Sequence, residues 1–351
     1  MVWNRMSGAV SEAEWRARSA PCCTRLRRIV CTELDFEDRS WTVRDDRQSD
    51  SAMCASSVTE TVANFFPEIE GNLTKITWAH AVNDKAKLNK TLEGNAMMLE
   101  ADVVLGKVTG QDTVQPIMAH PPANESDLSL ENFLNAVIEK KGRKGIKLDF
   151  KSIEAFNGSK PILDKVRNNL TFPVFLNADI LEGPTNATAT PVDAKSFVGQ
   201  AKAYPEYTLS VGWTTNYTEN GTENTDRYTE QQIQRMISTL KEQKVAQPVT
   251  YPVRAGLAAN DASVIKKLME NSDIKNASLT VWSSERDKVD ADKLSQLIRE
   301  IGVEKVYVDV PDDLMAKLRL SAASSPRSPA VALALAATLF LAVSSILPST
   351  L

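Results

Sequence analysis

Residues 97–106 read MMLEADVVLG, an apolar stretch interrupted by two acids, Glu100 and Asp102. The pattern predicts a buried strand, in which residues two apart point to the same face. Glu100 and Asp102 then lie a few ångströms apart, and two carboxylates that close repel each other unless a cation or a proton lies between them. A divalent metal fits this position, because hard cations prefer carboxylate oxygens. The alternative is a pair of solvent-facing acids on an exposed strand.

Strands and helices alternate along the chain outward from this stretch. The other predicted strands are 75–83, 145–151, 173–180, 207–213, 249–257, 277–283 and 305–310, and the predicted helices are 85–93, 129–141, 162–170, 194–203, 229–243, 262–270, 290–301 and 312–320. Eight strands that alternate with helices over about 250 residues predict an α/β fold, a (β/α)8 TIM barrel. The alternative is an open doubly wound sheet, but no glycine-rich phosphate loop follows the first strand and no Rossmann fingerprint occurs.

The composition divides the chain into three parts. Residues 1–60 hold no apolar run long enough for a signal-peptide core, so we interpret residues 1–70 as a disordered extension or as a start that is not the natural one. Residues 71–320 hold the predicted barrel. Residues 321–351 combine small residues, a short polar spacer and a terminal apolar tail, the pattern of a GPI-attachment signal. A single membrane-spanning helix is the alternative, although no basic residues follow the tail.

Acceptor sites for N-glycosylation indicate the compartment. Asn-x-Ser/Thr occurs nine times, against about three expected at random. These sites are Asn72, Asn89, Asn124, Asn157, Asn169, Asn186, Asn216, Asn220 and Asn276. We therefore expect a secreted, glycosylated protein anchored at the cell surface, and the alternative is a surface that is merely rich in Asn and Thr.

Cysteine positions and net charge exclude some classes of site and partner. The four cysteines are Cys22, Cys23, Cys31 and Cys54, which excludes a disulfide framework or a cysteine metal site in the barrel. The net charge of -4 gives no reason to expect a nucleic acid or an anionic membrane surface as partner.

Polar residues gather at the ends of the predicted strands, where the catalytic groups of a TIM barrel lie. Asp149 would add a third carboxylate to Glu100 and Asp102, and together they could hold Mg²⁺ or Ca²⁺. Zinc is less favoured, since no pair of histidines has ligand spacing. Lys151 shares a strand face with Asp149 and could meet a phosphate or pair with the carboxylates.

The two histidines of the chain are His80, near the end of the first strand, and His120, at the end of the short piece after the second strand. Histidine transfers protons near neutral pH, so both are candidate acid–base residues. Trp78, Trp213 and Trp282 could line an apolar part of a substrate, and core packing is the alternative role for them.

The joint set of motifs resembles the phospholipase C-like phosphodiesterase superfamily, which includes glycerophosphodiester phosphodiesterases and sphingomyelinase D enzymes. The closer similarity is to the menorin family, in the segments WAHAVN, LEADV, PIMAHPP, GIKLDFK and PVFLNADIL, and it covers about residues 72–320.

This resemblance implies a role for each matched residue. His80 and His120 would act as general acid and base, Glu100, Asp102 and Asp149 would hold the cation, Lys151 would neutralise the phosphate, and Trp282 would line the pocket. One difference is that Ala81-Val82 replaces the Arg-Gly that usually follows the first histidine of the phosphodiesterases. Arg254 is a candidate to replace the missing arginine, and Asn177 is a further candidate for substrate contact.

Two functions follow from the resemblance. The first is metal-dependent hydrolysis of a phosphodiester lipid or a glycerophosphodiester at the cell surface. The alternative is a binding module without enzymatic activity, because the menorin family is associated with neuronal dendrite patterning alongside L1-type adhesion molecules. Its partner would then be the ectodomain of a cell-adhesion receptor.

Overall fold

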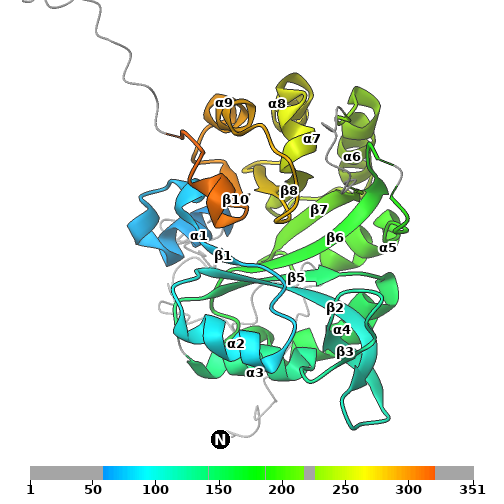
Figure 1. Ribbon diagram of the computed structural model, residues 1–351. Helices are drawn as coiled ribbons and strands as arrows, with labels where there is room; N and C mark the ends of the chain where they lie inside the picture. Colours follow the sequence, from blue (N-terminus) through cyan, green and yellow to red (C-terminus); the bar gives the residue numbers. More distant parts are fainter. Residues whose placement is uncertain (1–57, 141, 186, 217–225, 321–351) are drawn as a thin grey trace, which may run out of the picture. The chain divides into compact units, whose positions relative to one another are not determined.

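The computed structural model describes residues 58–320, apart from 141, 186 and 217–225 (Figure 1). All of them lie in one compact unit, Cys54–Leu351, and the other unit, Met1–Met53, falls outside the described residues. Eight parallel strands form a nearly closed barrel, and helices alternate with them along the chain. The predicted α/β TIM barrel is therefore confirmed, in preference to an open doubly wound sheet.

The barrel strands follow one another in space in the order of the sequence. They are β1 (Trp78–Ala79), β2 (Met98–Val108), β5 (Gly145–Phe150), β6 (Val174–Glu182), β7 (Thr208–Thr214), β8 (Val249–Arg254), β9 (Ser278–Trp282) and β10 (Val306–Asp309). Two further strands pair with the long β2. β3 (Val114–Met118) runs antiparallel to it and β4 (Glu125–Ser126) runs parallel. The connection that follows β2 in the sequence therefore contains a hairpin partner of β2.

Helices connect the strands, and short 3₁₀ turns precede β1 and β6. The helices are α1 (Val58–Phe65), α2 (Lys85–Glu93), α3 (Leu130–Lys140), α4 (Ile153–Val166), α5 (Ala194–Ala201), α6 (Glu230–Glu242), α7 (Ala255–Ala259), α8 (Ala262–Asn271), α9 (Ala291–Ile301) and α10 (Asp312–Met315); the turns are η1 (Pro67–Ile69), η2 (Leu73–Lys75) and η3 (Arg167–Asn169). Asp84 caps α2 by accepting a hydrogen bond from the Lys87 amide (2.7 Å), and the helix has the predicted bounds of 85–93.

Four predicted elements differ clearly from the observed ones, and one of them is the helix predicted at 312–320, which ends at Met315 as α10. The strand predicted at 75–83 shrinks to β1, since η2 extends to Lys75 and Ala81 has a left-handed conformation (φ 51) that ends the strand. The strand predicted at 249–257 stops at Arg254, where α7 begins. The helix predicted at 162–170 instead begins at Ile153 and passes through Pro161, because the Ser152 cap and a buried apolar face on α4 outweigh the proline.

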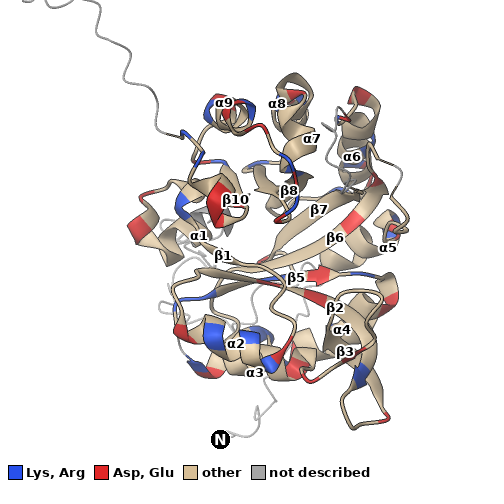
Figure 2. Cartoon of the chain, in the orientation of Figure 1, with Lys and Arg blue, Asp and Glu red and all other residues tan. Residues whose placement is uncertain are grey.

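Side chains of the barrel strands alternate between two environments. Those that point outward, such as Leu99 and Leu148, are buried against the helices in the main hydrophobic core. Those that point inward fill the barrel, and the strand register aligns Asp102, Asp149 and Asn177 in one layer. Figure 2 shows the acidic positions on the neighbouring strands β2, β5 and β6. The polar site is therefore built inside the barrel.

A separate apolar cluster closes the barrel below this polar layer. It consists of Val62, Phe66, Ile69, Leu73 and Ile76 from the segment before β1, packed with Met98, Phe175 and Tyr307 from the strands. The folded part thus begins before the predicted boundary at residue 71. That boundary was too late because the apolar residues of a short helix and two turns gain their burial only from the assembled barrel.

Residues outside the described ranges carry several of the sequence predictions. All four cysteines, Asn186, Asn220 and the predicted anchor at 321–351 belong to them. Six of the other glycosylation sites have exposed asparagines, and Asn72, which caps η2, is partly buried. No helix within the described ranges is long and apolar enough to cross a membrane.

Replacement of Phe66 by alanine tests the role of the apolar cluster. Phe66 is fully buried, so Phe66→Ala leaves a cavity and is expected to lower the free energy of unfolding by about 3 to 5 kcal/mol. Val114→Ala, at a side chain that is 61% exposed, serves as the control and is expected to change it by less than about 0.5 kcal/mol. Urea unfolding measures both changes. Equal, small effects would contradict a structural role for the segment before β1.

Candidate functional site

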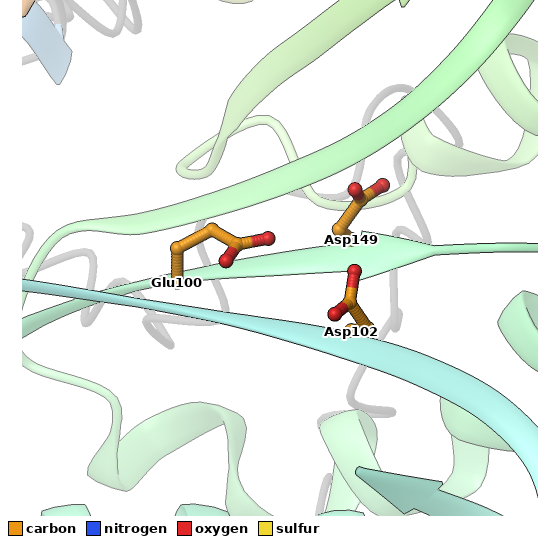
Figure 3. Close-up of side chains that lie close together, drawn as sticks. All are labelled: Glu100, Asp102 and Asp149. Carbon is orange, nitrogen blue, oxygen red and sulfur yellow. The ribbon is translucent and has the colours of Figure 1, made fainter. Parts of the chain in front are cut away.

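The three acids predicted to share a site come together inside the barrel (Figure 3). Glu100, Asp102 and Asp149 each contribute an oxygen atom that lies within 4.8 Å of the other two. The register that pairs Asp102 with Asp149 across β2 and β5 produces this arrangement, and Glu100 lies two residues earlier on the same face. Glu100 and Asp102 are 2% and 4% exposed, so they are not solvent-facing acids.

Fixed donors orient each of these carboxylates. Asn83 Nδ2 donates to Asp102 Oδ2, and Asn177 Nδ2 donates to Asp149 Oδ1, both at 2.7 Å. The Ala81 amide donates to Glu100 Oε2 at 2.7 Å. Ala81 has φ 51, a left-handed conformation that is rare for a residue with a side chain and that is often retained at functional sites.

Lys151 bridges two of the carboxylates. Its Nζ lies 2.7 Å from Asp102 Oδ1 and 2.7 Å from Asp149 Oδ2. Burial alone would lower the pKa of Lys151, but the charges of Asp149 and Asp102 raise it well above its ordinary value. Burial would likewise raise the pKa of Asp149, but Lys151 and Lys147 lower it to about 2. Lys151 and Asp149 are therefore both charged at neutral pH, and Lys151 pairs with the carboxylates, which was the alternative to its expected contact with a phosphate.

His80 lies between two carboxylates at the point where β1 and β10 meet. Its Nδ1 is 3.2 Å from Asp309 Oδ2 and 3.5 Å from Glu100 Oε2. Burial alone would lower the pKa of His80. The charge of Glu100 and the hydrogen bond to Asp309 outweigh that effect and raise the pKa to about 9. The imidazole is therefore protonated at neutral pH. Burial, followed by the charges of Asp102 and Asp149, raises the pKa of Glu100, and His80 opposes that rise.

His120 lies at the rim and does not share the surroundings of His80. Ala119, the residue before it, donates its amide to the Asp102 backbone carbonyl at 3.1 Å, which places the chain just before His120 beside β2. Its ring is exposed, and Nδ1 lies 2.7 Å from the Pro121 carbonyl oxygen. A carbonyl only accepts hydrogen bonds, so we assign the proton to Nδ1, which leaves Nε2 with a free lone pair when the ring is neutral.

Asp179 is a site residue that the sequence analysis did not select. It follows Asn177 by two residues on β6 and points to the same side. A Cβ atom on Gly212 would lie 2.7 Å from Asp179 Oδ1, so the glycine on β7 makes room for this carboxylate. Burial and the charge of Asp149 raise the pKa of Asp179 to about 7. The alternation of Asn177 and Asp179 was the signal that could have identified it.

Arg254 and Trp282 lie beside each other near a cavity at this end of the barrel. The cavity has a volume of about 1030 Å³, and His80, Arg254 and Asp309 are among its lining residues. The Arg254 guanidinium stacks on Trp282 at 5.0 Å and forms a bidentate ion pair with Asp287, with both distances at 2.7 Å. Arg254 thus has the predicted location, but its charge is already paired.

The charge balance favours a bound cation. Apart from the pair formed by Arg254 and Asp287, the described interior carries the carboxylates of Glu100, Asp102, Asp149, Asp179 and Asp309. Three cationic groups oppose these five when His80 is protonated, namely Lys147, Lys151 and His80. The carboxylates outnumber the cationic groups, although the raised pKa values of Glu100 and Asp179 reduce the excess of negative charge near neutral pH. Three converging carboxylates in such surroundings fit a hard divalent ion such as Mg²⁺ or Ca²⁺.

Comparisons with known proteins point to one family. The model of the menorin N-terminal domain matches residues 72–315. Protein FAM151B from Homo sapiens is 38% identical over 237 residues, which cover 67% of this chain and 82% of that protein. A solved structure of a candidate alpha-L-fucosidase from Bacteroides thetaiotaomicron aligns with a TM-score of 0.40 and 11% identity, over 68% of this chain and 88% of that one. This structural similarity is too low to support any inference about function.

The two histidines allow a direct test of the His80 surroundings. We expect NMR titration of the metal-free protein to give a pKa of about 9 for His80. Asp309→Asn removes one of the groups that raise it and is expected to shift the pKa toward the ordinary value of 6.5. Asp313→Asn, at an exposed acid that lines the same cavity, is the control and should leave His80 unchanged. A His80 pKa near 6.5 in the unaltered protein would contradict the described contacts.

The pH dependence of stability tests Asp179. Between its ordinary pKa of 3.8 and about 7, Asp179 binds a proton in the folded chain but not in the unfolded chain, so its contribution to stability falls as the pH rises through this range. Asp179→Asn is therefore expected to stabilise the metal-free protein at pH 8, on the order of 1 to 2 kcal/mol after solvent screening, and to have little effect near pH 4. Asp112→Asn, at a fully exposed side chain, is the control for urea unfolding at both pH values. Equal effects of Asp179→Asn at the two pH values would refute the raised pKa.

Proposed function

The chain belongs to the menorin family, and from this premise we propose that it is a metal-dependent phosphodiesterase that acts on a phosphodiester lipid or a glycerophosphodiester. The observation that carries this proposal is the convergence of Glu100, Asp102 and Asp149 on one point inside the barrel. Buried carboxylates that are oriented by amide donors form a site of hard oxygen ligands, which is the environment that Mg²⁺ and Ca²⁺ select.

These three residues would hold the cation. When bound, a divalent cation polarises a phosphoryl oxygen and stabilises the negative charge that develops in the transition state. The residues around the trio support its geometry: Asn83, Asn177 and the Ala81 amide fix the carboxylates, and Lys151 holds Asp102 and Asp149 close together. We therefore assign Lys151 to orientation of the ligands.

The different partners of the two histidines separate their acid–base roles. His80 is protonated at neutral pH and lines the cavity, so we assign it as the general acid that protonates the leaving oxygen. His120 carries its proton on Nδ1 and presents the free Nε2, so we assign it as the general base that takes a proton from the attacking water or hydroxyl.

The compartment is part of the proposal. The glycosylation sites that lie on exposed asparagines and the C-terminal pattern of a GPI signal favour a glycoprotein held at the outer cell surface, where it would meet phosphodiester lipids. The cavity beside His80 and Arg254 would accept the part of the substrate next to the phosphate, with Trp282 behind the Arg254 guanidinium.

Removal of one proposed ligand tests this function. We expect the purified protein to bind Mg²⁺ or Ca²⁺ in calorimetric titrations, and Glu100→Gln and Asp102→Asn to abolish that binding together with hydrolysis of a panel of phosphodiesters. His80→Ala is expected to keep metal binding and to lower kcat/KM by roughly 10² to 10⁴. Glu125→Gln, an equivalent change at an exposed acid on β4, is the control.

Two outcomes would contradict the proposal. Activity in Glu100→Gln equal to that of the unaltered protein would show that the carboxylate trio is not the active site. Metal binding with no turnover above the His80→Ala background, for any phosphodiester in the panel, would refute hydrolysis and favour the alternative of a binding module for an adhesion receptor.

A further inference from the structure

Lys147 is a buried lysine that makes no direct ion pair within the described part of the chain. It lies on β5, its side chain points into the barrel between Glu100 on β2 and Phe175 on β6, and it is 4% exposed. Within the described part of the chain, no hydrogen bond or ion pair involves its Nζ, whose nearest recorded partner is the Trp78 ring at 6.0 Å. Burial of an unpaired ammonium is costly, so this position calls for a physical reason.

The position of Lys147 relative to the site supplies that reason. The apolar cluster with Phe175 and Met98 lies on one side of it, and the layer with Asp102 and Asp149 lies on the other. After burial, which is the main influence on each, the charge of Lys147 acts on the pKa of groups that surround the centre of the barrel. These groups are His80, Glu100, Asp149 and Asp179, from four neighbouring parts of the barrel.

The other two permanent cations near the site are already used. Both contacts of Lys151 go to Asp102 and Asp149, and the Arg254 guanidinium is paired with Asp287. Ala81 stands immediately after His80 and contributes its backbone amide to Glu100 but no charge. Among the described residues of the barrel interior, Lys147 is therefore the lysine or arginine that makes no direct ion pair and could form one with a bound anion.

We propose that Lys147 is an anion-binding residue, whose ammonium binds the phosphate group of the ligand from the inner side of the barrel. It would supply the positive charge that Arg254 was expected to supply. The identity of the anion as a phosphodiester rests on the proposed function, whereas the existence of an anion site does not. Because the interior has an excess of carboxylates, a phosphate group would bind only after a divalent cation has reduced their repulsion.

Binding of inorganic phosphate to the full chain tests this inference without any need for turnover. In calorimetric titrations with Mg²⁺ present, we expect the unaltered protein to bind phosphate, and Lys147→Met, which keeps the length of the side chain but removes its charge, to weaken that binding at least tenfold. Lys147→Arg keeps the charge and is expected to stay within a few-fold of the unaltered protein. Lys90→Met, at an exposed lysine on α2, is the matched control and should bind phosphate normally.

A second measurement keeps the test valid if Lys147→Met fails to fold. In the unaltered protein with ¹³C-labelled lysine, phosphate is expected to shift the NMR signal of the Lys147 side chain. That signal is assigned as the one missing from the spectrum of Lys147→Arg. The inference is overturned if the unaltered protein binds no phosphate at millimolar concentration, if Lys147→Met binds it equally well, or if the Lys147 signal does not move.

These outcomes separate the inference from the proposed function. Phosphate binding that depends on Lys147, in a protein that hydrolyses no phosphodiester, would support the anion site and refute hydrolysis. If the unaltered protein hydrolyses a phosphodiester but Lys147→Met binds phosphate equally well, the role of Lys147 is refuted and the proposed function is not.

Discussion

The double ion pair of Lys151 with Asp102 and Asp149 is the interaction on which the polar half of this barrel depends. The two carboxylates lie at paired positions of β2 and β5, so the register that builds the barrel also forces them together. Without a cation between them, their repulsion would oppose that register. The Lys151 ammonium satisfies one oxygen of each, Asn83 and Asn177 satisfy the others, and the paired strands can then carry ionised acids in the interior.

The apolar half of the barrel allows such a polar interior. β1 and β10 lie at the two ends of the strand order, so the barrel closes between them. Two contacts join the chain there: the Leu73 amide donates to the Val303 carbonyl at 2.9 Å, and His80 contacts Asp309. Below it, the cluster around Phe66 fills the barrel with apolar side chains. Burial of that apolar surface stabilises the fold, so the layer with Asp102 and Asp149 does not have to contribute to stability itself.

The alternation of side chains along a strand was enough to predict that Glu100, Asp102 and Asp149 lie together, because the parallel strands of a barrel place inward-facing residues side by side. Alternation says nothing about partners that come from loops, so the pairing of Arg254 with Asp287, 33 residues later, could not be predicted. The same limit hid the cluster around Phe66, whose short segments have no periodic pattern long enough to identify. Asp179 was visible in the alternation with Asn177, but its raised pKa depends on burial and on Asp149, which only the assembled barrel provides.

The two histidines show why residue type alone does not fix a catalytic role. His80 faces two carboxylates, which favour its charged form, whereas His120 faces a carbonyl, which selects one neutral tautomer but adds no charge. A cation held by Glu100 would compete with His80 for the same negative charge and would lower the pKa of His80 from about 9 toward neutrality. His80, which is too weak an acid in the metal-free protein, would then become able to give up its proton once the metal is bound. Under the proposed function, the contact between His80 and Glu100 would therefore link metal binding to proton donation within a single side-chain pair.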